Sequence, residues 1–273
     1  MHQLGRGGQY GRMASSAAAG GPGLATSSWW SAHRPTAAIV AVVAVVAVLI
    51  VALAVTQGGA ANAESNGPNR AVSVAAGPVA TVDFQSVPGQ LTIVGSSGSS
   101  GSSGSQVRLT GHLDWHSHAA AATETARTAG NVLYLTARCA RRSPCTENYR
   151  LTVPAHTAVV LDQPSGHVTV SGLDSALRVT ATSADISATG LRSPSLDATI
   201  TSAHLSASFT GPARQIGLTL KSAQATIRLP GAARYLVSQQ VTWGYIKVGI
   251  PQSASSSRHI DARLISSELE LLP

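Results

Sequence analysis

A loose repeat over the second half of the chain constrains the fold more than any other feature. A marker of three residues recurs every ~18 to 23 residues, a length typical of one coil in a protein built from stacked coils. The markers are Ser165-Gly166-His167, Ser183-Ala184-Asp185, Ser202-Ala203-His204, Ser222-Ala223-Gln224, Trp243-Gly244-Tyr245 and Ser266-Ser267-Glu268. One such unit cannot close a core alone, so we expect the units to stack.

Alternating apolar residues flank each marker. After Ser202, for example, Leu205, Ala207 and Phe209 alternate with polar residues, and residues 196–200 alternate in the same way before it. Successive strand side chains point to opposite faces, so each unit is predicted to be two short strands joined at a small-residue bend. The predicted fold class is therefore all-β, with stacked two-strand coils in a β-solenoid or a two-sheet, β-helix-like arrangement. We expect the coils to stack in chain order.

An unbroken apolar run without charge or proline covers residues 37–55. About 20 such residues cross ~30 Å of hydrocarbon, so we predict one N-terminal transmembrane helix here. Arginines precede the run and Glu64 is the first charge after it, which places residues 1–36, predicted to be disordered, in the cytoplasm. The expected location is the cell membrane, with a single pass and an extracytoplasmic C-terminal domain. Ala61-Asn62-Ala63 leaves open cleavage after Ala63, as in a signal peptide.

The rest of the chain divides by composition. Residues 56–77 are predicted to be a polar stalk, residues 78–158 an N-terminal β region, and residues 159–273 the β-repeat domain. The β region contains a Gly/Ser loop at 95–105 and a cysteine loop at 139–145. Residues 81–94 resemble the later coil at 159–170, and we interpret them as a degenerate first coil.

Cys139 and Cys145 are the two cysteines of the chain. Outside the cell, two cysteines across a short loop indicate a disulfide. A catalytic cysteine is the alternative, but it needs a neighbouring base and a lowered pKa, and no local motif supports one.

Two groups of polar residues are candidate sites. His112, Asp114, His116 and His118 follow one another along a predicted strand and could ligate zinc or copper. Histidines two apart on a strand lie ~7 Å apart, which is long for one ion, so a solvated strand face is favoured.

Stacking would also align the third marker residues in one surface column, which includes His167, Asp185 and His204. The alternative is that these are ordinary outward polar residues. Trp243 and Tyr245 are candidate contacts for glycans or partners, although a role in the core or as a cap is more common for such aromatics.

The motifs around the cysteines extend this interpretation. The Cys-loop-Cys, the segment Tyr149-Arg150-Leu151-Thr152-Val153-Pro154 and coils marked Ser-Gly-x-Val-x-Val resemble the bacterial "putative adhesin" domain, a domain of unknown function found in actinobacterial membrane proteins. The resemblance is strongest over 151–273 and weaker over 81–150. It implies a β-solenoid ectodomain behind one membrane anchor, and it implies no known ligand. Alanine replaces the marker glycine at 184, 203 and 223; alanine resists positive φ, so those bends are expected to differ.

Function is less constrained than fold. The net charge of +7 is scattered and forms no stripe for nucleic acid. The sequence has no Gly-x-Ser-x-Gly elbow, phosphate loop or His-Glu-x-x-His motif, so we expect neither catalysis nor a cofactor. The leading hypothesis is a membrane-anchored, adhesin-like surface scaffold or weak binder of cell-wall or envelope components. An envelope-sensing regulator is the first alternative, and a glycan-active enzyme is the second.

Overall fold

The computed structural model describes residues 69–96, 106–115, 122–140 and 144–273, all within one compact unit. The predicted transmembrane helix at 37–55 and most of the Gly/Ser loop lie outside these ranges. Among the residues so described, no helix has the length and apolar character to cross a membrane.

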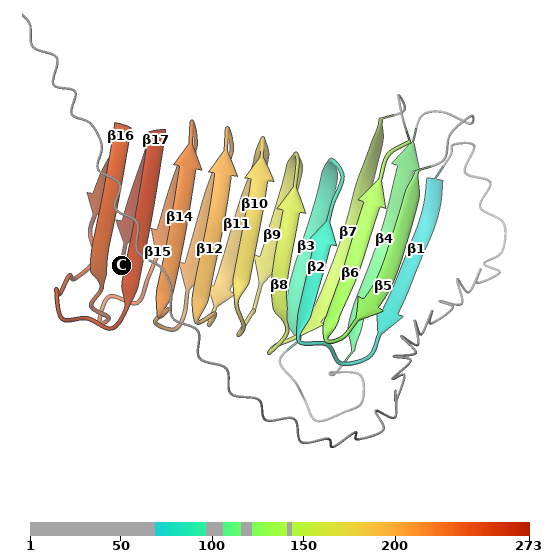
Figure 1. Cartoon of the computed structure of the whole chain (residues 1–273), viewed down its shortest axis with the longest axis horizontal. Helices are drawn as coiled ribbons and strands as arrows, with labels where there is room; N and C mark the ends of the chain where they lie inside the picture. Colours follow the sequence, from blue (N-terminus) through green and yellow to red (C-terminus); the bar gives the residue numbers. More distant parts are fainter. Residues whose placement is uncertain (1–68, 97–105, 116–121, 141–143) are drawn as a thin grey trace, which may run out of the picture. The chain divides into compact units, whose positions relative to one another are not determined.

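The described chain consists of β-strands, and their pairings form two ladders (Figure 1). The first ladder runs in the order β5 (Thr123–Ala129), β6 (Val132–Arg138), β2 (Thr81–Gln85), β8 (Ala158–Gln163), β10 (Leu177–Thr182), β12 (Ser195–Thr201), β14 (Gln215–Lys221), β17 (His259–Leu272) and β16 (Leu236–Val248). The second runs β1 (Asn69–Ala76), β4 (Val107–Trp115), β7 (Cys145–Pro154), β3 (Gly89–Ser96), β9 (Gly166–Ser171), β11 (Ala184–Leu191), β13 (His204–Phe209), β15 (Gln224–Arg228), β17 and β16.

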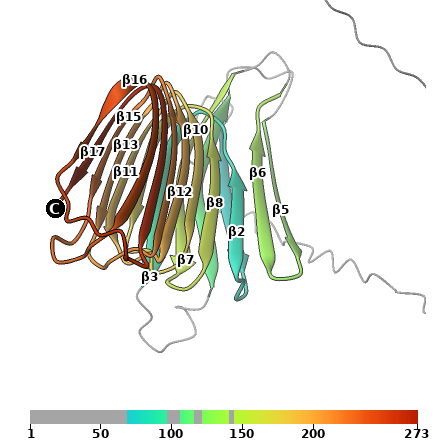
Figure 2. The same cartoon turned by 60° about the vertical axis from the view of Figure 1, so that its left-hand side comes forward.

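Each coil contributes one strand to each ladder, which confirms the predicted all-β stack of two-strand coils. Figure 2 shows the ladders as two layers. The long strands β16 and β17 bend and belong to both. Pairing between coils is parallel, whereas β1, β4 and β5 pair antiparallel at one end of the stack.

The prediction that coils stack in chain order is right in the middle and wrong at both ends. The β2–β3 coil lies between β6–β7 and β8–β9, and β17 lies between β14–β15 and β16. At the C-terminal end the cause is visible in the strands themselves. At the inward position where β17 has Ala262, β16 has the polar Gln239, so β17 suits the interior and β16 the exposed end.

Two local predictions also need correction. Residues 69–76, predicted as part of the stalk, form β1, because Val72 and Val74 alternate into the core. Strand β5 was not predicted, since its sequence TETARTA lacks an apolar alternation.

The core lies between the ladders and is built from columns of equivalent residues. Val159, Leu177, Leu196, Ile216 and Ile260 follow one another in register, and each is at most 2% exposed. Such columns let identical alternation on every coil bury one continuous apolar strip.

The bends at the markers differ as their sequences imply. At the two glycine markers, Gly166 has φ 110° and Gly244 has φ 115°, a conformation that L-residues avoid. At the alanine markers the left-handed residue is instead the preceding serine, with φ 60° at Ser183, 50° at Ser202 and 50° at Ser222. The alanine that follows keeps an ordinary φ and points into the core.

Candidate functional site

A column of polar side chains crosses the outer face of the second ladder. We call it the polar column, and in spatial order it consists of His112, Asn148, Gln90, His167, Asp185, His204, Gln224, Glu268 and Tyr245. Every member is exposed except Glu268, which is half-buried. Strand register therefore spaces these groups ~4.8 Å apart, one per strand.

The predicted alignment of His167, Asp185 and His204 is present: Asp185 is directly in register with both histidines. Two features differ from expectation. Glu268 precedes Tyr245 because β17 lies inside β16, and the column continues beyond His167 through Gln90, Asn148 and His112.

Hydrogen bonds connect the C-terminal end of the column. Gln224 Nε2 donates to Glu268 Oε2 at 3.3 Å, and the Tyr245 hydroxyl donates to the same oxygen at 3.5 Å. The negative charge of Glu268 raises the pKa of the Tyr245 hydroxyl, which is therefore a donor at neutral pH.

A second column of hydroxyl groups runs beside the first. Thr169, Ser187, Ser206 and Thr226 are in register two residues further along the same strands. Amides, imidazoles, carboxylates and hydroxyls can each donate to or accept from a sugar hydroxyl. The polar column contains no lysine or arginine, so its chemistry suits a neutral, hydroxyl-rich chain better than an anionic one.

The metal hypothesis is only partly within the described residues. His112 is an exposed member of the polar column, and Asp114 lies two residues along β4; His116 and His118 fall outside the described ranges. Within those ranges, no group of three or more His, Cys, Asp or Glu residues is placed to hold a metal ion.

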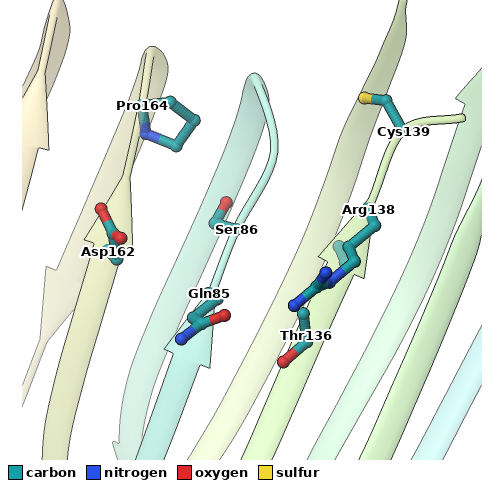
Figure 3. A pocket seen from close by; sticks show the side chains of 8 residues that line it. Gln85, Ser86, Thr136, Arg138, Cys139, Asp162 and Pro164 are labelled. Atoms are coloured by element: carbon teal, nitrogen blue, oxygen red, sulfur yellow. The ribbon is translucent and has the colours of Figure 1, made fainter. Parts of the chain in front are cut away.

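A shallow pocket of about 410 Å³ lies on the outer face of the first ladder, where β2, β6 and β8 end (Figure 3). Gln85 is in register with Asp162 on one side and Thr136 on the other. Arg138 and Pro164 complete the rim. The pocket offers both charges and an amide, but it is open to solvent and no aromatic side chain lines it.

Ser86 connects this pocket to a buried acid. Its hydroxyl donates to Glu147 Oε1, and the Val87 N–H donates to Glu147 Oε2 at 3.3 Å. Glu147 is 2% exposed, and its burial raises the pKa of the carboxyl to about 7; the two hydrogen bonds oppose the rise.

A second carboxyl lies near the first. The Tyr149 hydroxyl donates to Glu124 Oε2 at 3.4 Å, while Glu124 Oε1 is buried and has no hydrogen-bond partner in the described part of the chain. Desolvation raises the pKa of Glu124 to about 7, and the Tyr149 hydrogen bond and nearby Arg70 oppose the rise. Burial and the neighbouring carboxyls also raise the pKa of Tyr149 well above its usual range.

Cys139 and Cys145 form the predicted disulfide, with Cα atoms 5.3 Å apart. Both thiols are consumed, so neither is a nucleophile in this state. The bond links the end of β6 to the start of β7, beside the pocket.

The aromatic residues near the C-terminus have different environments. Tyr235 is fully buried, in line with a core role. Trp243 is 80% exposed at the bend of β16 and Tyr245 is 49% exposed, so neither lies in the core; both lie on the strand that ends the stack.

Our sequence reasoning missed the buried acid and the pocket. Glu147 was detectable, because the alternation Cys145, Glu147, Tyr149, Leu151 puts it on the inward face of β7. The pocket was not, since Gln85 and Thr136 meet only through long-range pairing.

Comparison with known proteins gives one family match. The family model described as Toastrack DUF4097, a domain of unknown function, matches residues 99–267. No curated protein matches the chain.

Solved structures that match the chain include a "putative cell adhesion protein" from Clostridium sporogenes, with 8% identity and a TM-score of 0.42 over 74% of this chain and 99% of that one. Another is a "putative adhesin" from Bacteroides fragilis, with 12% identity and a TM-score of 0.36 over 74% of this chain and 97% of that one. A "putative adhesin" from Parabacteroides distasonis has 12% identity and a TM-score of 0.35 over 76% of this chain and 98% of that one. Similarities this low transfer no property to this chain.

Proposed function

The chain belongs to the Toastrack DUF4097 family, and from that premise we propose that it is an adhesin-like surface protein that binds an extended, hydroxyl-rich glycan of the cell envelope. In this proposal, residues 37–55 anchor it in the membrane and the β-stack lies outside the cell. Its action is binding, without a catalytic step.

The polar column is the observation that carries this proposal. A linear glycan presents hydroxyl groups at regular intervals, and the column presents a donor or acceptor on each successive strand. The neighbouring hydroxyl column widens the contact to two rows. Each contact is weak in water, so affinity would come from many of them acting along one polymer.

The experiment compares two triple variants of the purified protein in co-sedimentation with insoluble cell-wall glycan. His167→Ala/Asp185→Ala/His204→Ala removes the centre of the column and should weaken binding at least about tenfold, the effect of losing roughly 1.4 kcal/mol. Thr180→Ala/Thr199→Ala/Thr219→Ala removes an equivalent exposed row from the first ladder and should bind like wild type.

Matched unfolding midpoints would show that both variants are folded. Equal binding by wild type and both variants would refute a role for the column. No binding of wild-type protein to any neutral envelope glycan would refute the proposal as a whole.

A further inference from the structure

Strand β16 ends both ladders with an unpaired edge. Within the described residues it pairs with β17 alone, through 236–242 in the first ladder and 244–248 in the second (Figure 1). Its inward-facing Val241 is 41% exposed, whereas Leu264, its neighbour in register on β17, is fully buried. The apolar core of the stack is therefore open at this end.

Most of this edge lacks the features that usually keep strand edges apart. Residues 236–246 contain no charged residue and no proline, although charges and prolines commonly protect exposed edges from pairing. The one charged residue of β16 is Lys247, which forms an ion pair with Glu270 on the neighbouring strand β17. The edge strands at the other end of the stack do carry charges: Arg70 on β1, and Glu124 and Arg127 on β5. The edge strands at one end of the stack therefore carry charges, whereas residues 236–246 at the other end carry none.

The shape of the edge limits what can cover it. β16 bends at Trp243 and Gly244, where φ is 62° and 115°, so its two halves present backbone groups in two different layers. A straight peptide could extend one ladder only. A bent coil of the same form could extend both ladders and cover the inner row of Val237, Val241 and Ile246.

A second β16 has that form. Antiparallel pairing about a twofold axis is self-complementary, since the same patch serves both partners. It also brings no like charges together along residues 236–246, which are uncharged, and Lys247, the one charged residue of β16, forms an ion pair with Glu270 of its own chain. We propose that β16 is a dimerisation edge, at which a second copy of this chain pairs its own β16 so that two stacks join end to end and close their open cores against each other.

The test uses the full chain in detergent and two lysine variants. Gln239 faces inward at the open end and is exposed in the single chain, so Gln239→Lys places two like charges at the junction. Thr180→Lys adds the same charge to an exposed position on β10, within the stack, and serves as the control. Sedimentation velocity should show dimers of wild type and Thr180→Lys, and a dissociation constant at least about tenfold higher for Gln239→Lys.

Thiol trapping provides a readout that does not depend on dissociation constants. Both native cysteines are in the disulfide, so a new cysteine is the only free thiol. A short bifunctional thiol reagent should link Gln239→Cys into dimers and leave Thr180→Cys unlinked. A monomeric wild type, a dimer that Gln239→Lys leaves unchanged, or equal linking at both positions would overturn the proposal. So would protection of β16 from hydrogen exchange only after another polypeptide is added.

Discussion

The hydroxyl of Ser86 donates a hydrogen bond to the carboxylate of Glu147, a residue 61 positions later in the chain. The bond joins the bend after β2 to the inward face of β7, and Glu147 is almost completely buried. A buried carboxyl with a pKa near 7 makes the stability of the fold depend on pH.

We expect the protein to be more stable at pH 5 than at pH 8. The folded-state pKa of Glu147 is about 7 against 4.5 unfolded, so folding takes up a proton. The resulting stabilisation is complete below about pH 4.5 and is lost as pH rises through about 7; for Glu147 it is on the order of 3 kcal/mol at most. Denaturant unfolding at several pH values measures it, and Glu124 should add in the same direction.

The matched variants for this prediction are Glu147→Gln and Glu270→Gln. The free energy of unfolding of Glu147→Gln should equal that of wild type at pH 5 and exceed it at pH 8, because a neutral amide avoids the buried charge. Glu270 lies half-buried at the surface and pairs with exposed Lys247, so its replacement is the control for removing a carboxylate outside the core. A stability that rises between pH 5 and 8 would contradict a pKa near 7 for the buried carboxyl of Glu147.

Loss of the disulfide should destabilise the fold moderately. The bond closes a loop with a sequence separation of 6, which corresponds to roughly 2 kcal/mol in the chain-entropy model. Chemical denaturation of Cys139→Ala/Cys145→Ala against wild type measures the difference. A reducing agent should lower the wild-type midpoint and have no effect on the double variant; an insensitive wild type would argue against the bond.

Glycine at position 166 should be irreplaceable by alanine. A Cβ there would approach the Gly89 carbonyl oxygen to 2.0 Å at a φ of 110°, so Gly166→Ala should cost roughly 2 to 4 kcal/mol. Gly211→Ala is the control, because its Cβ would meet only Arg192 at 3.9 Å. Thermal unfolding distinguishes the two variants. Similar losses of stability at both positions would contradict the close approach of the β3 and β9 backbones.

The spatial order of β17 and β16 predicts that shortening two neighbouring side chains, Leu264 and Val241, will lower the free energy of unfolding by different amounts. Leu264 on β17 is fully buried, so Leu264→Ala should cost about 2 to 5 kcal/mol. Val241 on β16 is half-exposed, and Val241→Ala should cost less than about 1 kcal/mol in dilute, monomeric protein. If β17 were the outer strand, as chain order suggests, the larger cost would fall on Val241.

Local sequence was enough to predict the class of fold and part of the candidate site. Alternation shows which residues face inward, and a repeat of nearly constant length places equivalent residues side by side in a parallel stack. Those two properties predicted the alignment of His167, Asp185 and His204. The disulfide followed from the two cysteines and the short loop between them.

Long-range pairing decided the rest. Periodicity reports the face on which a side chain lies, but not which strand lies beside it, so it could not place β2–β3 between later coils or β17 inside β16. The same limit hid the bond from Ser86 to Glu147 and the open edge of β16. Faces are a property of neighbouring residues along the chain, whereas strand order depends on the free energy of the whole stack, to which residues far apart in sequence contribute together.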